Sequence, residues 1–97
     1  MNLVQLRTFK PQIEALASQY KIDPGSIRVF GSVARGDAAE NSDIDFLVKP
    51  LKGCSIFDLA GFYEDMGLML KCPVDVVSER AIFTPMRDAI LSDATPL

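Results

Sequence analysis

The chain contains no histidine, and it contains only two cysteines in 97 residues. Without histidine, neither a Ser-His nor a Cys-His nucleophile can be assembled, and most zinc sites are excluded as well. The cysteines, Cys54 and Cys72, lack the spacing of metal ligands. We therefore expect two reduced thiols in a cytoplasmic protein, since disulfides are rare in that compartment.

Long apolar runs and basic stretches are also missing. The first twenty residues carry Arg7, Lys10 and Glu14, so this segment fits neither a signal peptide nor a membrane span. No basic run is interleaved with aromatic residues and the net charge is −3, so we expect no extended nucleic-acid binding. A small anionic ligand that arrives with its own metal ion stays compatible with this charge, because the metal reverses the local sign.

The residues that are present suit one compact domain. With 97 residues and 48% hydrophobic content, the chain is expected to form a single domain over 1–97. The core of so small a domain is modest, and the mean hydropathy is positive at +0.18. Apolar surface covered by another protein would explain this value, and so would a buried three-layer fold.

Apolar residues at intervals of three or four predict an amphipathic helix over 2–20, with a kink or restart at Pro11. The further predicted elements are strands over 26–30, 42–49 and 73–77, a short helix capped by Ser32 and ended by Gly36, and helices over 55–71 and 85–92. The inner face of the 55–71 helix is predicted from its spacing as Ile56, Leu59, Ala60, Tyr63, Met66 and Leu70. Helices and strands that alternate in this way predict an α/β fold in which helices cover a small sheet.

Two carboxylates share one face of a predicted strand. Because side chains alternate along a strand, Asp43 and Asp45 point to the same side, and at about 6.6 Å they repel by roughly 2–3 kcal/mol. Water would screen such a pair on an exposed strand end, which is the plain structural alternative. The apolar run Phe46–Val48 instead predicts a strand buried on both faces, where carboxylates need a cation. Asp75, set in the next apolar strand, would complete a three-carboxylate metal site if the two strands are neighbours; otherwise it is an isolated acid.

A small-residue turn lies upstream of these acids. Gly31 permits close approach of the backbone, and the helix that follows would direct free N–H groups at an anion, to which Ser32 adds a hydroxyl donor. Arg35 could contact a phosphate or pair with an acid such as Asp37. A plain Gly-Ser turn is the structural alternative, and the Gly-x4-Gly-Lys-Ser/Thr pattern of a P-loop is absent.

The combination resembles a known superfamily. Gly31-Ser32, ten further residues and then Asp43-Ile44-Asp45 are similar to the signature of the DNA polymerase β-like nucleotidyltransferases. The fuller segments that resemble the minimal nucleotidyltransferases (MNT) within it are Phe30–Gly36, Asn41–Val48, Val74–Glu79 and Ile90–Ala94. The resemblance covers the whole chain and implies a small mixed sheet flanked by helices.

The resemblance also implies roles for the residues and a partner. Asp43 and Asp45 would bind two Mg²⁺ ions, with Asp75 as a third acid that binds metal and helps to activate the attacking hydroxyl. Gly31 and Ser32 would hold the triphosphate of ATP. Members of the family often act as antitoxins beside a helical HEPN-domain toxin, and some transfer AMP from ATP to a tyrosine of that toxin.

Our leading hypothesis is therefore a Mg²⁺-dependent nucleotidyltransferase that acts as a protein adenylyltransferase antitoxin. One alternative is a non-catalytic antitoxin that neutralises its partner by binding, and another is transfer to a small molecule or an RNA end. Transfer of labelled AMP that depends on Asp43 and Asp45 would distinguish the first from the second. We expect the partner to bind the N-terminal helix and residues 79–97, although ordinary packing onto the sheet would account for most of these residues.

Overall fold

The computed structural model describes residues 1–39, 42–81 and 85–97. Its elements follow in the order α1 (Leu3–Arg7), α2 (Lys10–Gln19), η1 (Pro24–Ser26), β1 (Arg28–Phe30), α3 (Gly31–Arg35), β2 (Ile44–Val48), α4 (Ile56–Leu70), β3 (Val74–Ser78), η2 (Glu79–Ala81), α5 (Met86–Asp93) and β4 (Thr95–Pro96). The strands form one sheet in the order β3-β2-β1-β4. Since β1 is antiparallel to β2 and β4 while β2 is parallel to β3, the sheet is mixed. The predicted α/β class, a small mixed sheet flanked by helices, is confirmed.

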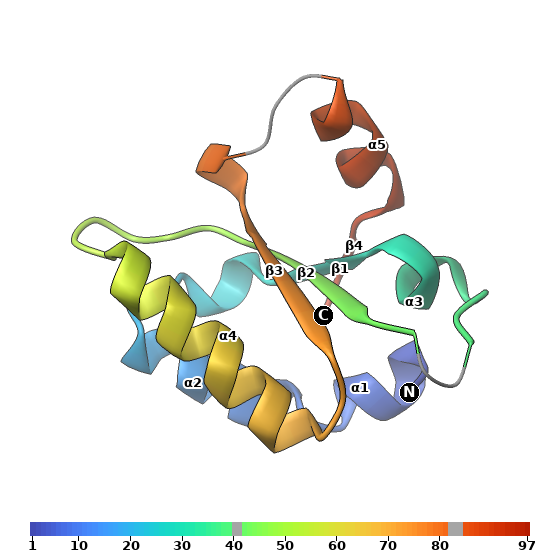
Figure 1. Ribbon diagram of the computed structural model, residues 1–97, viewed down its shortest axis with the longest axis horizontal. Helices are drawn as coiled ribbons and strands as arrows, with labels where there is room; N and C mark the ends of the chain where they lie inside the picture. The colour runs from blue at the N-terminus through green and yellow to red at the C-terminus, as the bar shows by residue number, and fades with distance from the viewer. Residues whose placement is uncertain (40–41, 82–84) are drawn as a thin grey trace.

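The two faces of the sheet are covered differently. Helices α1, α2 and α4 lie against one face, which we call the core face, and α5 lies on the opposite side (Figure 1). The core face supplies the buried strand residues Val29, Ile44, Phe46 and Val48, which pack with the helix residues Leu6, Ile13, Phe62 and Met66. Alternation along β2 directs its remaining side chains to the other face, which we call the acid face.

The expected restart of the N-terminal helix is confirmed. Asn2 caps α1 through a capping box with Gln5, whose side chain accepts a hydrogen bond of 2.9 Å from the Asn2 N–H. A second helix, α2, then begins with Lys10 and Pro11, where the missing N–H of proline costs no intrahelical bond. Leu6 and Ile13 are fully buried, so one apolar face continues across the break.

The predicted inner face of α4 is wrong in part. Met66 and Leu70 are buried as expected, but Ile56 is 76% exposed and Tyr63 is 51% exposed, and Phe62 takes the buried position instead. The rotation of the helix is set by α2: the rings of Tyr20 and Phe62 meet edge to face at 6.5 Å. A Cβ at Gly61 would lie 3.0 Å from Cζ of Tyr20, the C-cap residue of α2, so this glycine packs closely against the end of α2.

Other differences are local. Helix α3 begins at Gly31 with Phe30 as its N-cap residue and no side-chain cap, so the predicted capping by Ser32 is wrong, whereas its end at the left-handed Gly36 is confirmed. Strand β4 was not predicted, and it pairs with β1 at Thr95 and Pro96. The segment Asn41–Val48 that carries the resemblance includes residue 41, and the expected partner segment over 79–97 includes 82–84; residues 40–41 and 82–84 lie outside the described residues.

Two further properties concern the described residues alone. Cys54 and Cys72 are both free thiols and both are half-buried, as expected for reduced cysteines. Among the helices that the structure describes, we find none with the length and apolar character needed to cross a membrane.

Candidate active site

Two of the three predicted acids lie side by side in the sheet. Strands β2 and β3 are parallel neighbours whose register pairs Asp45 with Asp75 and Ile44 with Val74. Residues paired in this way point to the same face, and Ile44 belongs to the core, so Asp45 and Asp75 lie together on the acid face. Asp43 stands one residue before β2 and, by alternation, on the same side as Asp45.

The predicted glycine turn lies against the same carboxylate. Phe30 at the end of β1 pairs with Asp45, so the first residue of α3 follows directly beside it. Gly31 has φ +74°, and a Cβ built there would lie 3.3 Å from Asp45 Cγ and still closer to Oδ2. Two separate constraints therefore require glycine at position 31: the positive φ and the lack of space for a Cβ beside the Asp45 carboxylate. Ser32 follows in the first turn of α3 and is half-buried.

The electrostatics of this site favour an added cation. Partial burial raises the pKa of Asp45 above its ordinary value, and the negative charges of Asp75 and Asp43 raise it further, while the positive charge of Arg35 acts in the opposite direction. Like charges that face one another on neighbouring strands are destabilising in the absence of a counter-ion. The arrangement is therefore one that a divalent cation would relieve.

The donor set suits magnesium, which prefers carboxylate oxygens. In the part of the chain that the structure describes, however, no three His, Cys, Asp or Glu side chains are gathered closely enough to form a metal site as they stand. The backbone thus brings Asp43, Asp45 and Asp75 to one face, and their side chains are not closed around a common point. Their role as metal ligands stays a prediction.

Arg35, predicted as a phosphate ligand, pairs with acids. Its Nε lies 3.3 Å from Asp37 Oδ2 and its Nη1 lies 2.6 Å from Asp93 Oδ2, so the second bond joins α3 to α5. These contacts raise the pKa of the Arg35 guanidinium. Pairing with Asp37 was the alternative that the sequence suggested, whereas Asp93 lies 58 positions away and no local signal indicated it.

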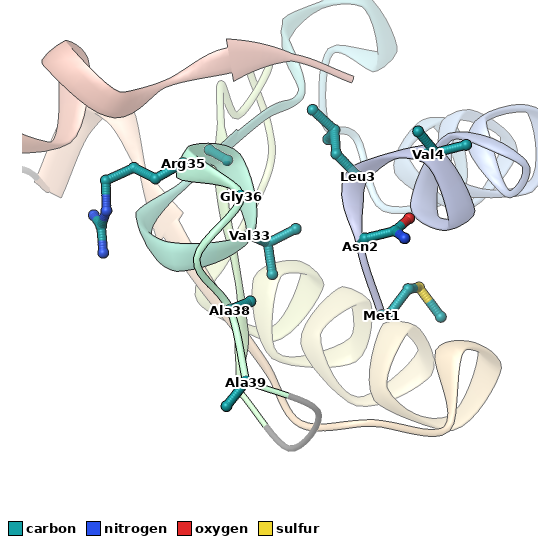
Figure 2. Close-up of a pocket in the computed structure, with 10 residues that line it drawn as sticks. Met1, Asn2, Leu3, Val4, Val33, Arg35, Gly36, Ala38 and Ala39 are labelled. Atoms are coloured by element: carbon teal, nitrogen blue, oxygen red, sulfur yellow. The ribbon is translucent and has the colours of Figure 1, made fainter.

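A cavity of about 510 Å³ lies between the start of α1 and the C-terminal half of α3. Figure 2 shows Val33 and Ala38 facing Met1 and Leu3 across this space, while the Arg35 side chain extends away from it. Its lining includes none of the three aspartates and neither Gly31 nor Ser32. The cavity is therefore separate from the acid face.

Sequence reasoning did not single out an ion pair that also lies on the acid face. Arg28 of β1 pairs with Glu79, the residue that follows β3, and the two side chains are 31% and 28% exposed. Because side chains alternate along a strand, Arg28 could have been placed on the same face as Phe30 from the sequence. Its partner Glu79 lies 51 positions later, and no local pattern indicates that pairing.

Exposed apolar side chains occur in the predicted partner segments and also outside them. Val4 of α1 and Met86 of α5 are exposed, in agreement with an accessible surface at both ends of the chain. Four more belong to α4, namely Ile56, Phe57, Tyr63 and Leu68. The partner surface remains a prediction, and α4 is an additional region to consider.

Comparison with known proteins places this chain and its fold in a class. The model of the nucleotidyltransferase domain family matches residues 10–97. A candidate protein adenylyltransferase of Methanocaldococcus jannaschii is 38% identical over 66 residues, which cover 68% of this chain and 71% of that protein. The solved structure of a candidate minimal nucleotidyltransferase has a TM-score of 0.85 and 37% identity, over 100% of this chain and 97% of the other.

A more distant structure shares the fold. An MNT antitoxin in complex with a tri-AMPylated Shewanella oneidensis HEPN toxin has a TM-score of 0.68 and 18% identity, over 93% of this chain and 69% of the other. The family match, together with the more similar relatives, defines a nucleotidyltransferase. More specifically, the chain belongs to the nucleotidyltransferase domain family, and its resemblance to the minimal nucleotidyltransferases is confirmed.

Proposed function

We propose that this protein is a Mg²⁺-dependent adenylyltransferase that acts as an antitoxin by transferring AMP from ATP to a tyrosine of a HEPN-type toxin. The observation that supports this most directly is the register of β2 and β3, which pairs Asp45 with Asp75 beside Gly31. The tri-AMPylated HEPN toxin in the structural neighbour supports AMP as the transferred group and a HEPN toxin as the acceptor.

Asp43, Asp45 and Asp75 would hold two Mg²⁺ ions. Bound there, the metal would neutralise the charge of the phosphates and lower the pKa of the acceptor hydroxyl. Partial burial and the charges of Asp75 and Asp43 raise the pKa of Asp45, and bound cations would offset that repulsion. The free N–H groups at the start of α3, with the Ser32 hydroxyl, would bind the triphosphate, and Gly31 leaves the room that this approach needs.

The reaction forms one bond and breaks one bond at the same phosphorus. The tyrosine oxygen attacks the α-phosphorus of ATP, and the bond from that phosphorus to the bridging oxygen breaks, so that pyrophosphate leaves. Asp75 is the group we assign to accept the hydroxyl proton, because it is the exposed member of the Asp45–Asp75 pair. To help bind the triphosphate of ATP, Arg35 would have to break its ion pair with Asp37 or Asp93 and pair with a phosphate instead.

The test is transfer of AMP from ATP labelled at the α-phosphate to the purified HEPN-type protein, with and without Mg²⁺. The variant Asp43→Ala/Asp45→Ala should reduce labelling to the background of the assay. Its control is Lys52→Ala, which removes an exposed charge from a loop outside the acid residues, the expected partner segments and α4, and should label as the wild type does.

Labelling by the Asp43→Ala/Asp45→Ala variant at the level of the wild type would refute the catalytic proposal. Cell protection is the second measurement. If this variant fails to transfer AMP and still protects cells from the toxin, the protein neutralises its partner by binding. Labelling of a small molecule or an RNA end in place of the protein would change the acceptor and leave the chemistry intact.

A further inference from the structure

The ion pair between Arg28 and Glu79 on the acid face links β1 to the end of β3, two strands that are separated by β2. Arg28 lies on β1, opposite Leu47 of β2, and Leu47 lies opposite Val77 of β3. Glu79 follows directly after β3, so the bond from Arg28 Nη2 to Glu79 Oε1 crosses over β2. The pair therefore connects both neighbours of the strand that carries Asp45.

This pair is built into the acid face rather than attached to the surface. Val29 is part of the core, so Arg28 beside it points to the opposite face, where Asp45 and Leu47 also lie. Leu47 is fully buried although it stands outside the main core cluster. With both side chains about two thirds covered, the ion pair is less screened by water than an exposed one.

The position of Asp75 depends on how β3 is held. In the sheet, β3 pairs with β2 alone and forms an edge. A shift of one residue in that pairing would turn Asp75 away from the acid face, because side chains alternate with a period of two. Glu79 begins η2 directly after β3, four residues after Asp75, and its bond to Arg28 on the acid face opposes such a shift.

We propose that Arg28 and Glu79 are positioning residues that lock β3 in the register that places Asp75 beside Asp45. The consequence for AMP transfer rests on the proposed function, whereas the consequence for metal binding can be measured by itself. Neither residue needs to touch the substrate. Their effect passes through Asp75, so it should disappear once Asp75 can no longer bind a cation.

The test measures Mn²⁺ binding to the nucleotide-free protein, followed by the EPR signal of free Mn²⁺, alongside AMP transfer. Arg28→Leu and Glu79→Leu should each weaken Mn²⁺ affinity by about tenfold or more, as is typical for residues that orient metal ligands. The charge swap Arg28→Glu/Glu79→Arg should recover most of that loss. Lys52→Leu, which removes one exposed positive charge from a loop, is the matched control and should bind Mn²⁺ as the wild type does.

Asp75→Asn separates positioning from a general loss of stability. In that background, breaking the ion pair should not weaken further the Mn²⁺ affinity that Asp43 and Asp45 retain, whereas a general loss of folded protein would reduce it again. Circular dichroism monitors the fold of each variant. If a leucine variant does not fold, Glu79→Gln keeps the side-chain size, removes the charge and provides the same test.

The outcomes distinguish this inference from the proposed function. Folded single variants with wild-type Mn²⁺ affinity would overturn the inference even if the wild type transfers AMP, and so would a charge swap no better than the single changes. A loss confined to Arg28→Leu, with Glu79→Gln unaffected, would show that Arg28 acts without the ion pair and overturn it too. If the Mn²⁺ results are as expected and the wild type transfers no AMP, the inference holds and the proposed function fails.

Discussion

The two faces of β2 are made from alternate residues of the same short strand and have opposite properties. On the core face, Ile44, Phe46 and Val48 are buried among α1, α2 and α4. On the acid face, Leu47 is also buried, but Asp45 is only half-buried and lies beside a second carboxylate, Asp75. The free energy that holds the strand in place therefore comes mainly from one side.

The difference shows how a domain of this size can accommodate repulsion between acids. Burial on the core face fixes where β2 and β3 lie, and the acid face then presents carboxylates that neither packing nor charge would bring together. Phe46 on the core face should therefore contribute to stability, and its neighbour Asp45 on the acid face to chemistry.

The largest effect on stability is expected from Phe46→Ala. This residue is fully buried, so the variant loses apolar burial and leaves a cavity, at a cost of about 3–5 kcal/mol in the free energy of unfolding. Urea denaturation followed by circular dichroism measures this loss. Asp45→Ala, one position away, is the control; a loss of similar size there would contradict the separation between the two faces.

The opposite pattern is expected from Asp45→Asn. The side chain keeps its shape and loses its charge, so repulsion from Asp75 falls and the midpoint of urea unfolding should stay the same or rise slightly. Mn²⁺ binding and AMP transfer should both be lost, because the amide is a much poorer ligand for a divalent cation. An unfolding midpoint well below that of the wild type would show that Asp45 stabilises the fold.

Two glycines permit a sharper comparison. Gly31 and Gly36, at the two ends of α3, have φ of +74° and +80°, so replacing either with alanine should cost roughly 1–2 kcal/mol of backbone strain. Only at Gly31 would the new Cβ also collide with the Asp45 carboxylate, whereas nothing lies within 4 Å of the position at Gly36. Gly31→Ala should therefore lose AMP transfer and be the less stable of the two. Equal transfer by both variants would argue against a role for the close approach at Gly31.

Sequence patterns predicted the parts of this protein that depend on local order. Alternation placed Asp43 and Asp45 on one face, and glycine with its neighbours predicted the turn at Gly31. A strand's neighbours depend on the whole chain, so the pairing of Asp45 with Asp75 was conditional until the fold was known. The same limit explains why β4 was missed, because its two residues carry no strand pattern of their own.

The errors at α4 and α3 have physical causes of the same kind. Nearly every position of α4 offers an apolar residue, so spacing alone could not choose between Tyr63 and Phe62 for the buried face. Contact with Tyr20 of α2 decided it. At α3, Ser32 has the right residue type for a cap, but the helix begins two residues earlier than that cap would place it, at Gly31, which turns beside Asp45.

The smallest expected effect uses Cys72 as a probe of charge on the acid face. The N–H of Ile44 donates a 3.1 Å hydrogen bond to the carbonyl of Pro73, so Cys72 lies near Asp43 at the start of β2. Burial raises the pKa of the Cys72 thiol, and the Asp43 charge adds to the increase while the N-terminal ammonium opposes it. A raised pKa favours the thiol over the thiolate, so alkylation by iodoacetamide should set in at higher pH than for a free cysteine.

Asp43→Asn should therefore shift the pH profile of Cys72 alkylation to lower pH by a small amount. Cys54 serves as the internal control, because burial and the charge of Asp58 raise its pKa and Asp43 is not among the causes. Mass spectrometry of the two cysteine-containing peptides separates the rates. Saturating Mg²⁺ should shift the Cys72 profile of the wild type in the same direction, because the cation would offset the negative charge of Asp43. If either change shifts the alkylation profiles of both cysteines, the charge of Asp43 does not act locally on Cys72. If neither change shifts the Cys72 profile, Asp43 does not influence the thiol and a cation does not reach it. Both results would contradict the prediction.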